Sequence, residues 1–246
     1  RVFISLKPQV NQVITDALKS EIKRFLKTKC SLGIEPVVLS PDLAYLQVST
    51  NFTFDQNATP LNSAAMTSLI VNLINSYVQS NTLDFKSSVS KTLLEKSILD
   101  TESSLTSLNT TFRIEKRAKF LPQKTSYSFD FANPIFHPHD GHSSVVFSND
   151  FTYYDELTAT NKIARVRDDG RGKLILFELS DNVETTITDD FGTVDYDAGI
   201  VNFNLALLSA ALSNVDIRVN AISANNIVSP SRNIVLIADP SSTVAT

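Results

Sequence analysis

The six residues 137–142 read HPHDGH and contain all three histidines of the chain. Imidazoles and carboxylates are good zinc ligands, so His137, His139, Asp140 and His142 could converge on one ion. The run nearly matches the H-x-H-x-D-H pattern of two-metal hydrolases, but its aspartate is at the fourth position, Gly141 is at the fifth, and no further histidine remains. We therefore expect a polar turn at Asp140-Gly141. A bound metal and a metal-dependent hydrolase are the alternatives.

Three other short matches to catalytic or binding motifs lack the rest of their patterns. Residues 170–173 (GRGK) resemble a phosphate-binding loop, but Leu174 replaces the Ser or Thr that such a loop needs. Residues 195–199 (DYDAG) imitate a calcium loop, but Ala206 stands where the bidentate glutamate belongs. Residues 190–192 (DFG) have no glycine-rich loop to accompany them. We predict hairpin turns at 168–172 and 197–199, and no catalytic residue, cofactor or functional metal.

The charge pattern gives no general reason to expect a polyanionic partner, because the formal net charge is -4. The cations of the first predicted helix lie on its polar side, and Arg113, Arg117 and Lys119 alternate with Glu115. A nucleic-acid face would need these cations without the interleaved acids, so a solvated or partner-facing surface is the favoured interpretation. Cys30 is the one cysteine, which excludes an internal disulfide. No apolar run reaches the roughly 20 residues that span a bilayer.

The first half of the chain alternates strand and helix patterns. Residues 1–7 predict a strand, 8–29 an amphipathic helix, and 35–56 a hairpin turning at 40–42. Helices follow from residue 60, with an apolar face containing Ile70 and Ile74, and over 88–99; a strand is expected over 111–120. This β-α-β-β-α-β order predicts a split βαβ arrangement, an α+β antiparallel sheet with helices on one face.

The second half is predicted to be a mainly antiparallel β module. Strands at 163–166 and 174–179 flank one hairpin turn, strands at 194–196 and 200–203 flank another, and residues 216–222 and 233–238 alternate again. A short helical stretch is expected near 205–212. We therefore divide the chain into an α+β sandwich domain at 1–120, a Pro-rich connection at 121–142 and a mainly β domain at 143–246.

An ordered series of segments resembles the baseplate wedge proteins of contractile-tailed phages of the T-even type, the baseplate J-like family. The series is RVFISLKP, then LGIEPVVLSPDLAYLQVSTNFTFD, then LDFKSSVSKTLLEKSILD, and finally DFGTVDYDAGIVNFN. The resemblance covers most of the chain and implies the C-terminal portion of a longer subunit. Its start at Arg1, with Met66 as the one methionine, leads us to expect an excised piece of a longer protein.

The resemblance implies a non-enzymatic structural protein of the virion tail baseplate, assembled in the host cytoplasm. Such a subunit self-associates into dimers that join as a ring, and it binds neighbouring wedge proteins. It implies no nucleic acid, membrane or small-molecule partner, and no site residue is carried over from the family. Besides the metal-dependent hydrolase, a glycan- or receptor-binding β module in the second half remains an alternative.

Overall fold

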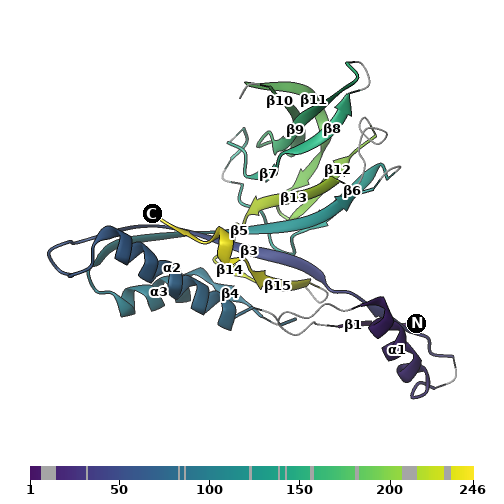
Figure 1. Ribbon diagram of the computed structural model, residues 1–246, viewed down its shortest axis with the longest axis horizontal. Coiled ribbons are helices and arrows are strands. Elements are labelled where there is room, and N and C mark those ends of the chain that lie inside the picture. Colours follow the sequence, from purple (N-terminus) through teal and green to yellow (C-terminus); the bar gives the residue numbers. More distant parts are fainter. Residues whose placement is uncertain are drawn as a thin grey trace.

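The computed structural model describes residues 1–6, 15–31, 33–82, 84–85, 87–121, 124–137, 139–141, 143–155, 158–180, 183–206, 215–229 and 234–246. The described chain is mixed α+β, with mainly antiparallel strands, as predicted. Figure 1 shows three parts: a small N-terminal unit, a lobe in which helices cover a sheet (the helix lobe), and a lobe made of strands (the strand lobe). Strand β5 (Leu105–Phe120) runs from the helix lobe into the strand lobe.

The N-terminal unit consists of β1 (Val2–Ser5), α1 (Asp16–Lys27) and β2 (Pro36–Leu39). Thr15 begins the helix, because its side chain accepts a hydrogen bond from the Leu18 N–H at 3.2 Å. The two strands pair in parallel, joined through the helix. The prediction that β2 forms a hairpin with the next strand is therefore wrong. The first part of the predicted helix, at 8–14, lies outside the described residues.

The helix lobe is built on β3 (Asp42–Phe54), which pairs antiparallel with β5. Helix α2 (Ser63–Ser80) buries a residue about every four positions, namely Met66, Ile70, Ile74 and Val78. Helix α3 (Lys91–Thr101) buries Leu94 and Ile98. These side chains share one core cluster with Leu46 and Val48 of β3, and each fully buried aliphatic contributes about 1.5–3 kcal/mol. The predicted helix pair and its apolar face are confirmed.

The far edge of β3 is occupied by the end of the chain. Strands β15 (Ile234–Ala238) and β16 (Val244–Ala245) run parallel to β3, and the short 3-10 helix Pro240–Ser242 joins them. With β5 on the other side, both edges of β3 are taken. This explains why β2 pairs with β1 instead. The predicted split βαβ sheet required β1 and β2 to belong to the same sheet as β3 and β5. In the structure β1 and β2 form a separate two-stranded sheet.

The strand lobe curls a long antiparallel sheet around an aromatic core. Its strands are β6 (Ser126–Asp130), β7 (Val146–Ser148), β8 (Phe151–Asp155), β9 (Thr160–Asp168), β10 (Lys173–Ser180), β11 (Val183–Asp195), β12 (Ile200–Asn204) and β13 (Val215–Ile222). The main order is β5-β13-β7-β9-β10-β11-β12-β6. The last strand returns to the end of β5, where the Tyr127 hydroxyl donates to Lys119 O at 3.0 Å and accepts from Leu121 N at 2.7 Å. Both predicted hairpins, β9–β10 and β11–β12, are confirmed.

The two lobes are tied together by backbone hydrogen bonds. Strand β14 (Ile227–Val228) pairs with β4 (Val89–Ser90), which leads directly into α3. The buried Asn133 amide holds Ser229 at both ends, donating to its carbonyl and accepting from its N–H, each at 3.1 Å. The sheet also continues across the predicted boundaries, and the 121–142 connection contains β6. The domain division stays a prediction. Most of the helical stretch expected at 205–212 lies outside the described residues.

Candidate functional site

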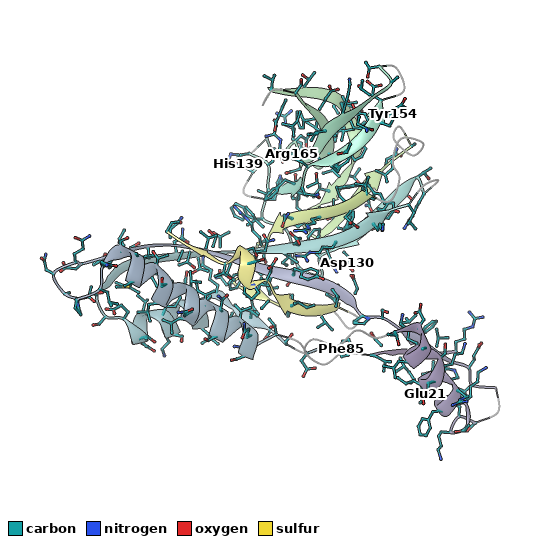
Figure 2. All side chains as sticks on the ribbon, viewed as in Figure 1. Glu21, Phe85, Asp130, His139, Tyr154 and Arg165 are labelled. Carbon is teal, nitrogen blue, oxygen red and sulfur yellow. The ribbon has the colours of Figure 1, made fainter. Side chains whose placement is uncertain are left out.

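The HPHDGH segment packs against the turn of the β9–β10 hairpin. The ring of His137 stacks on Tyr196, with centroids 4.0 Å apart and planes 11° apart. Its Nε2 lies 2.9 Å from Gly170 O, and the Gly141 N–H donates to the same carbonyl at 2.9 Å. His139 is exposed at the surface (Figure 2), and His142 lies outside the described residues. In the described part of this segment, His137 thus connects the loop to the hairpin.

The described residues contain no group of three or more His, Cys, Asp or Glu placed to hold one metal ion. The side chains of His137 and Asp140 approach to 3.9 Å. Of the four candidate metal ligands, the structure therefore brings together His137 and Asp140. The His137 ring, however, already stacks on Tyr196 and contacts the carbonyl of Gly170.

A buried carboxylate, Asp168, lies beneath this loop. It is 2% exposed, and its Oδ1 accepts hydrogen bonds from the N–H groups of Val145 and Val146, both at 2.8 Å. Its Oδ2 accepts from the Tyr196 hydroxyl at 2.8 Å. A buried carboxylate is costly unless it is hydrogen-bonded, and these three donors meet that need. Asp168 thereby joins the start of β7 to the hairpin at β11–β12.

The Tyr196 phenol predicts a loss of stability at alkaline pH. Burial, and then the hydrogen bond to Asp168, raise the pKa of Tyr196 above its ordinary range. The unfolded phenol ionises near pH 10 while the folded phenol keeps its proton, so the unfolding free energy falls as pH rises above about 10. The contribution of this group is about 1.4 kcal/mol per pH unit. Urea unfolding between pH 9 and 11 should show a shallower decline for Tyr196→Phe than for the unmodified chain. Equal slopes would refute the assignment.

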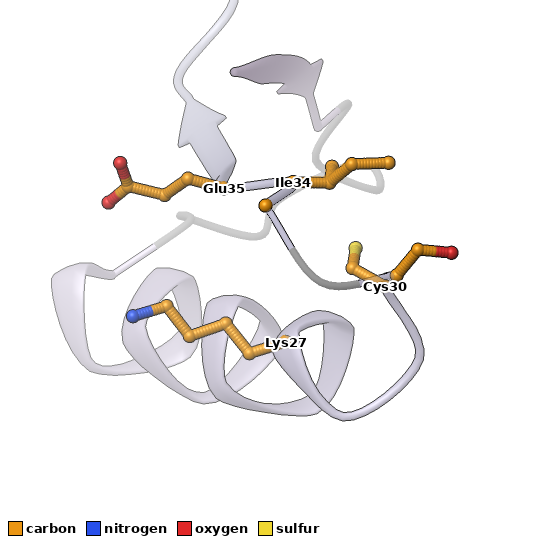
Figure 3. Close-up of a pocket in the computed structure, with 6 residues that line it drawn as sticks. Lys27, Cys30, Ile34 and Glu35 are labelled. Atoms are coloured by element: carbon orange, nitrogen blue, oxygen red, sulfur yellow. The ribbon is translucent and has the colours of Figure 1, made fainter.

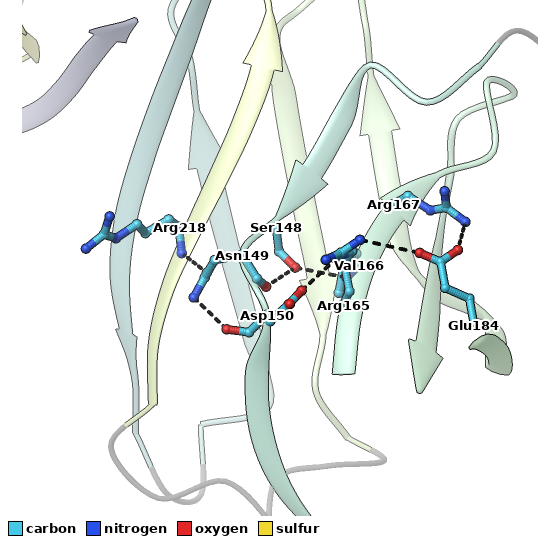
Figure 4. A network of polar contacts seen from close by, with 8 residues as sticks. All are labelled: Ser148, Asn149, Asp150, Arg165, Val166, Arg167, Glu184 and Arg218. Atoms are coloured by element: carbon cyan, nitrogen blue, oxygen red, sulfur yellow. Dashed lines mark hydrogen bonds and ion pairs between the residues drawn. The ribbon is translucent and has the colours of Figure 1, made fainter. Parts of the chain in front are cut away.

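The outer face of the strand lobe carries a network of charged side chains (Figure 4). Arg165 contacts Asp150 at 2.7 Å and Glu184 at 3.5 Å, and Arg167 also pairs with Glu184. Asp150 raises the pKa of the Arg165 guanidinium through their hydrogen bond. On β5, Arg117 pairs with Glu115, and its guanidinium lies 3.6 Å from the centre of the Tyr45 ring. These arginines are largely neutralised within the chain.

A shallow hollow lies in the N-terminal unit, between the end of α1 and the start of β2 (Figure 3). It is lined by Lys27, Cys30, Ile34 and Glu35, among others, and Cys30 is a free, partly buried thiol. The Glu35 carboxylate forms ion pairs with Arg1 at 3.6 Å and with Lys23 at 3.5 Å. We assign no chemistry to this hollow, because no residue in the described ranges forms a hydrogen bond or ion pair with the thiol of Cys30.

Six large apolar side chains of the N-terminal unit are exposed in the described chain. Helix α1 buries none of its residues, although it is strongly amphipathic in sequence. Phe3 is 65% exposed and Phe25 60% exposed, and Val2, Leu18, Ile34 and Leu39 are each more than 40% exposed. A two-stranded sheet with one short helix cannot bury enough apolar surface to be stable by itself. Such a surface is typical of an interaction site.

Comparison with protein-family models and with curated proteins returns no match for this chain. None of the described helices is both long enough and apolar enough to cross a bilayer. The candidate site therefore rests on the geometry above.

Sequence reasoning missed both Asp168 and Asn133. Asp168 precedes Asp169-Gly170, so it resembles an ordinary turn residue. The signal that could have found it is its position two and four residues after Val166 and Ala164, both buried on β9. Asn133 follows a strand and precedes Pro134, which is typical of a turn. Only its partner Ser229, 96 residues away, reveals its structural role.

Proposed function

We propose that the chain is a non-enzymatic structural subunit of a contractile phage tail baseplate wedge. In this proposal it self-associates and binds neighbouring wedge proteins, so that the baseplate ring is formed and held. The ordered series of family-like segments supports the proposal. The observation that carries it is the exposed apolar surface on β1, α1 and β2, where Phe3 and Phe25 are each at least 60% exposed.

The joint between the lobes is also suited to a scaffold. Ser223 N donates to Phe112 O at 3.0 Å, Ala224 N to Pro134 O at 2.9 Å, and Lys91 N to Asn226 O at 2.7 Å. The first two bonds hold the segment after β13 against β5 and against Pro134, and the third ties the same segment to the first residue of α3. A subunit that transmits force between neighbours benefits from such joints, because many backbone bonds must break before the lobes separate.

Native mass spectrometry of the purified chain, without added metal or chelator, tests this proposal. We expect a metal-free dimer or a higher even assembly whose population grows with protein concentration. A monomer carrying one or two stoichiometric metal ions would contradict the proposal and direct attention to His137, His139 and Asp140. A metal-free monomer at every concentration would contradict self-association.

A further inference from the structure

Charge is distributed very unevenly along this chain. Residues 1–35 contain seven Lys or Arg and three Asp or Glu, a formal charge of +4; the whole chain is at -4, so the remainder carries -8. Residues 174–217 contain eight Asp or Glu and no Lys or Arg. A basic N-terminal unit and an acidic stretch of the strand lobe are thus present in the same molecule.

The basic unit has cations that lack a carboxylate partner next to its exposed apolar side chains. Arg24, Lys27 and Lys29 form no ion pair with any carboxylate of the described residues. Phe25 lies between them in sequence and is 60% exposed. A surface that combines exposed apolar area with free positive charge favours an acidic partner with apolar side chains of its own.

Strand β11 offers such a surface at an open edge. It pairs with β10 from Val183 to Thr188 and again at Gly192 and Thr193, with an irregular stretch between them that contains Asp189 and Asp190. Its pairing with β12 begins only at Gly192, so residues 183–191 have no strand on that side within the described chain. Val183 is 62% and Ile187 39% exposed along this edge. Asp189 and Asp190 are exposed and form no ion pair with a described residue. Open edges are commonly protected by a covering helix.

The two surfaces lie apart within one copy. Figure 1 shows α1 at the lower right and β11 at the top, and Figure 2 shows Glu21 of α1 far from Tyr154 and Arg165 of the strand lobe. The joint at Asn133 and β14 holds the helix lobe to the strand lobe. We therefore consider a contact between α1 and β11 that is made between two molecules.

We propose that α1 of one copy docks on the open edge of β11, residues 183–191, of a second copy. Phe25 and Leu18 would contact Val183 and Ile187, and Arg24 and Lys27 would face Asp189 and Asp190. The contact is head-to-tail, because it joins two different surfaces, and such contacts close into rings or extend into filaments. This inference rests on the proposed self-association and specifies one of its interfaces.

Paired charge reversals test the contact. The first variant carries Arg24→Glu and Lys27→Glu, and the second carries Asp189→Lys and Asp190→Lys. We expect sedimentation velocity to show that each variant alone self-associates at least tenfold more weakly than the unmodified chain. An equimolar mixture should recover assembly, because each acidic α1 then meets a basic β11 edge and each basic α1 an acidic one. Assembly of the unmodified chain should also weaken with added salt.

The control variant carries Lys96→Glu and Lys119→Glu, which changes the net charge as much as the first variant does, at exposed positions elsewhere. It should assemble normally, and circular dichroism should show all variants folded. Assembly of either reversed variant at unmodified strength, or a mixture that stays monomeric, would overturn this contact and leave self-association through another surface intact. A monomeric unmodified chain would overturn both proposals.

Discussion

Replacing Gly199 with alanine is expected to destabilise the strand lobe by about 2–5 kcal/mol. Gly199 has φ +68°, and a Cβ built there would lie 2.1 Å from the carbonyl oxygen and 2.9 Å from the carbonyl carbon of Asn133. A left-handed conformation costs an L-residue about 1–2 kcal/mol, and overpacking against a fixed group adds about 1–3 kcal/mol. Backbone cannot rotate away as a side chain can, so the β11–β12 turn must separate from Asn133.

Thermal and urea unfolding of Gly199→Ala measure this effect, with Gly172→Ala as the control. Gly172 has φ +94°, but its Cβ would meet only Val194 O, at 3.3 Å. The control should therefore lose about 1–2 kcal/mol from strain alone. Similar losses in both variants would show that the turn at Gly199 adapts. Loss of the Phe131 N–H bond to Gly199 O, at 2.9 Å, should appear as faster amide exchange at Phe131.

Asp168→Ala should cost about 3–5 kcal/mol of unfolding free energy. The substitution leaves two backbone N–H groups and the Tyr196 hydroxyl without their acceptor in an interior that excludes water. Each unsatisfied buried group costs about 1–3 kcal/mol, and partial relaxation reduces the sum. For a chain of this size the expected fall in Tm is roughly 10 °C.

Asp197→Ala is the matched control for Asp168→Ala. Asp197 lies in the β11–β12 turn of the same lobe and is exposed, so its removal should change stability by less than about 0.5 kcal/mol. Asp168→Asn should fall between the two, because an amide keeps one acceptor but presents an N–H₂ group where acceptance is needed. Equal stabilities of the alanine variants would show that Asp168 does not join β7 to the hairpin.

Surface and interior substitutions are expected to affect different properties, namely assembly and folding stability. Val183, Ile187 and the α1 side chains are exposed, so their substitution should leave Tm nearly unchanged while changing assembly. Gly199 and Asp168 are interior positions, so their substitution should lower Tm first. Variants that changed both properties together would indicate that assembly and folding are coupled in this chain.

Local chemistry determined the elements that the sequence predicted correctly. The apolar spacing of Ile70, Ile74 and Val78 indicates one face of a helix, and all three residues are buried. The turn residues Asp169-Gly170 and Asp197-Ala198-Gly199 indicate hairpins, because they permit a tight reversal between strands with two-residue alternation. The two-residue alternation on β3 places Leu46, Val48 and Thr50 on one face, and all three are buried. Each of these signals depends on neighbours within a few residues.

Tertiary structure alone decided which strands meet and which polar groups are partnered. Strand β3 pairs with β5, β15 and β16, whose residues lie up to 195 positions away. That pairing left β2 to pair with β1. Asp168 and Asn133 resemble turn residues until their distant partners are known. The open edge of β11 likewise exists only because β12 begins its pairing at Gly192. Strand pairing is set by competition for edges and by burial across the whole chain, and a local pattern contains no information on that competition.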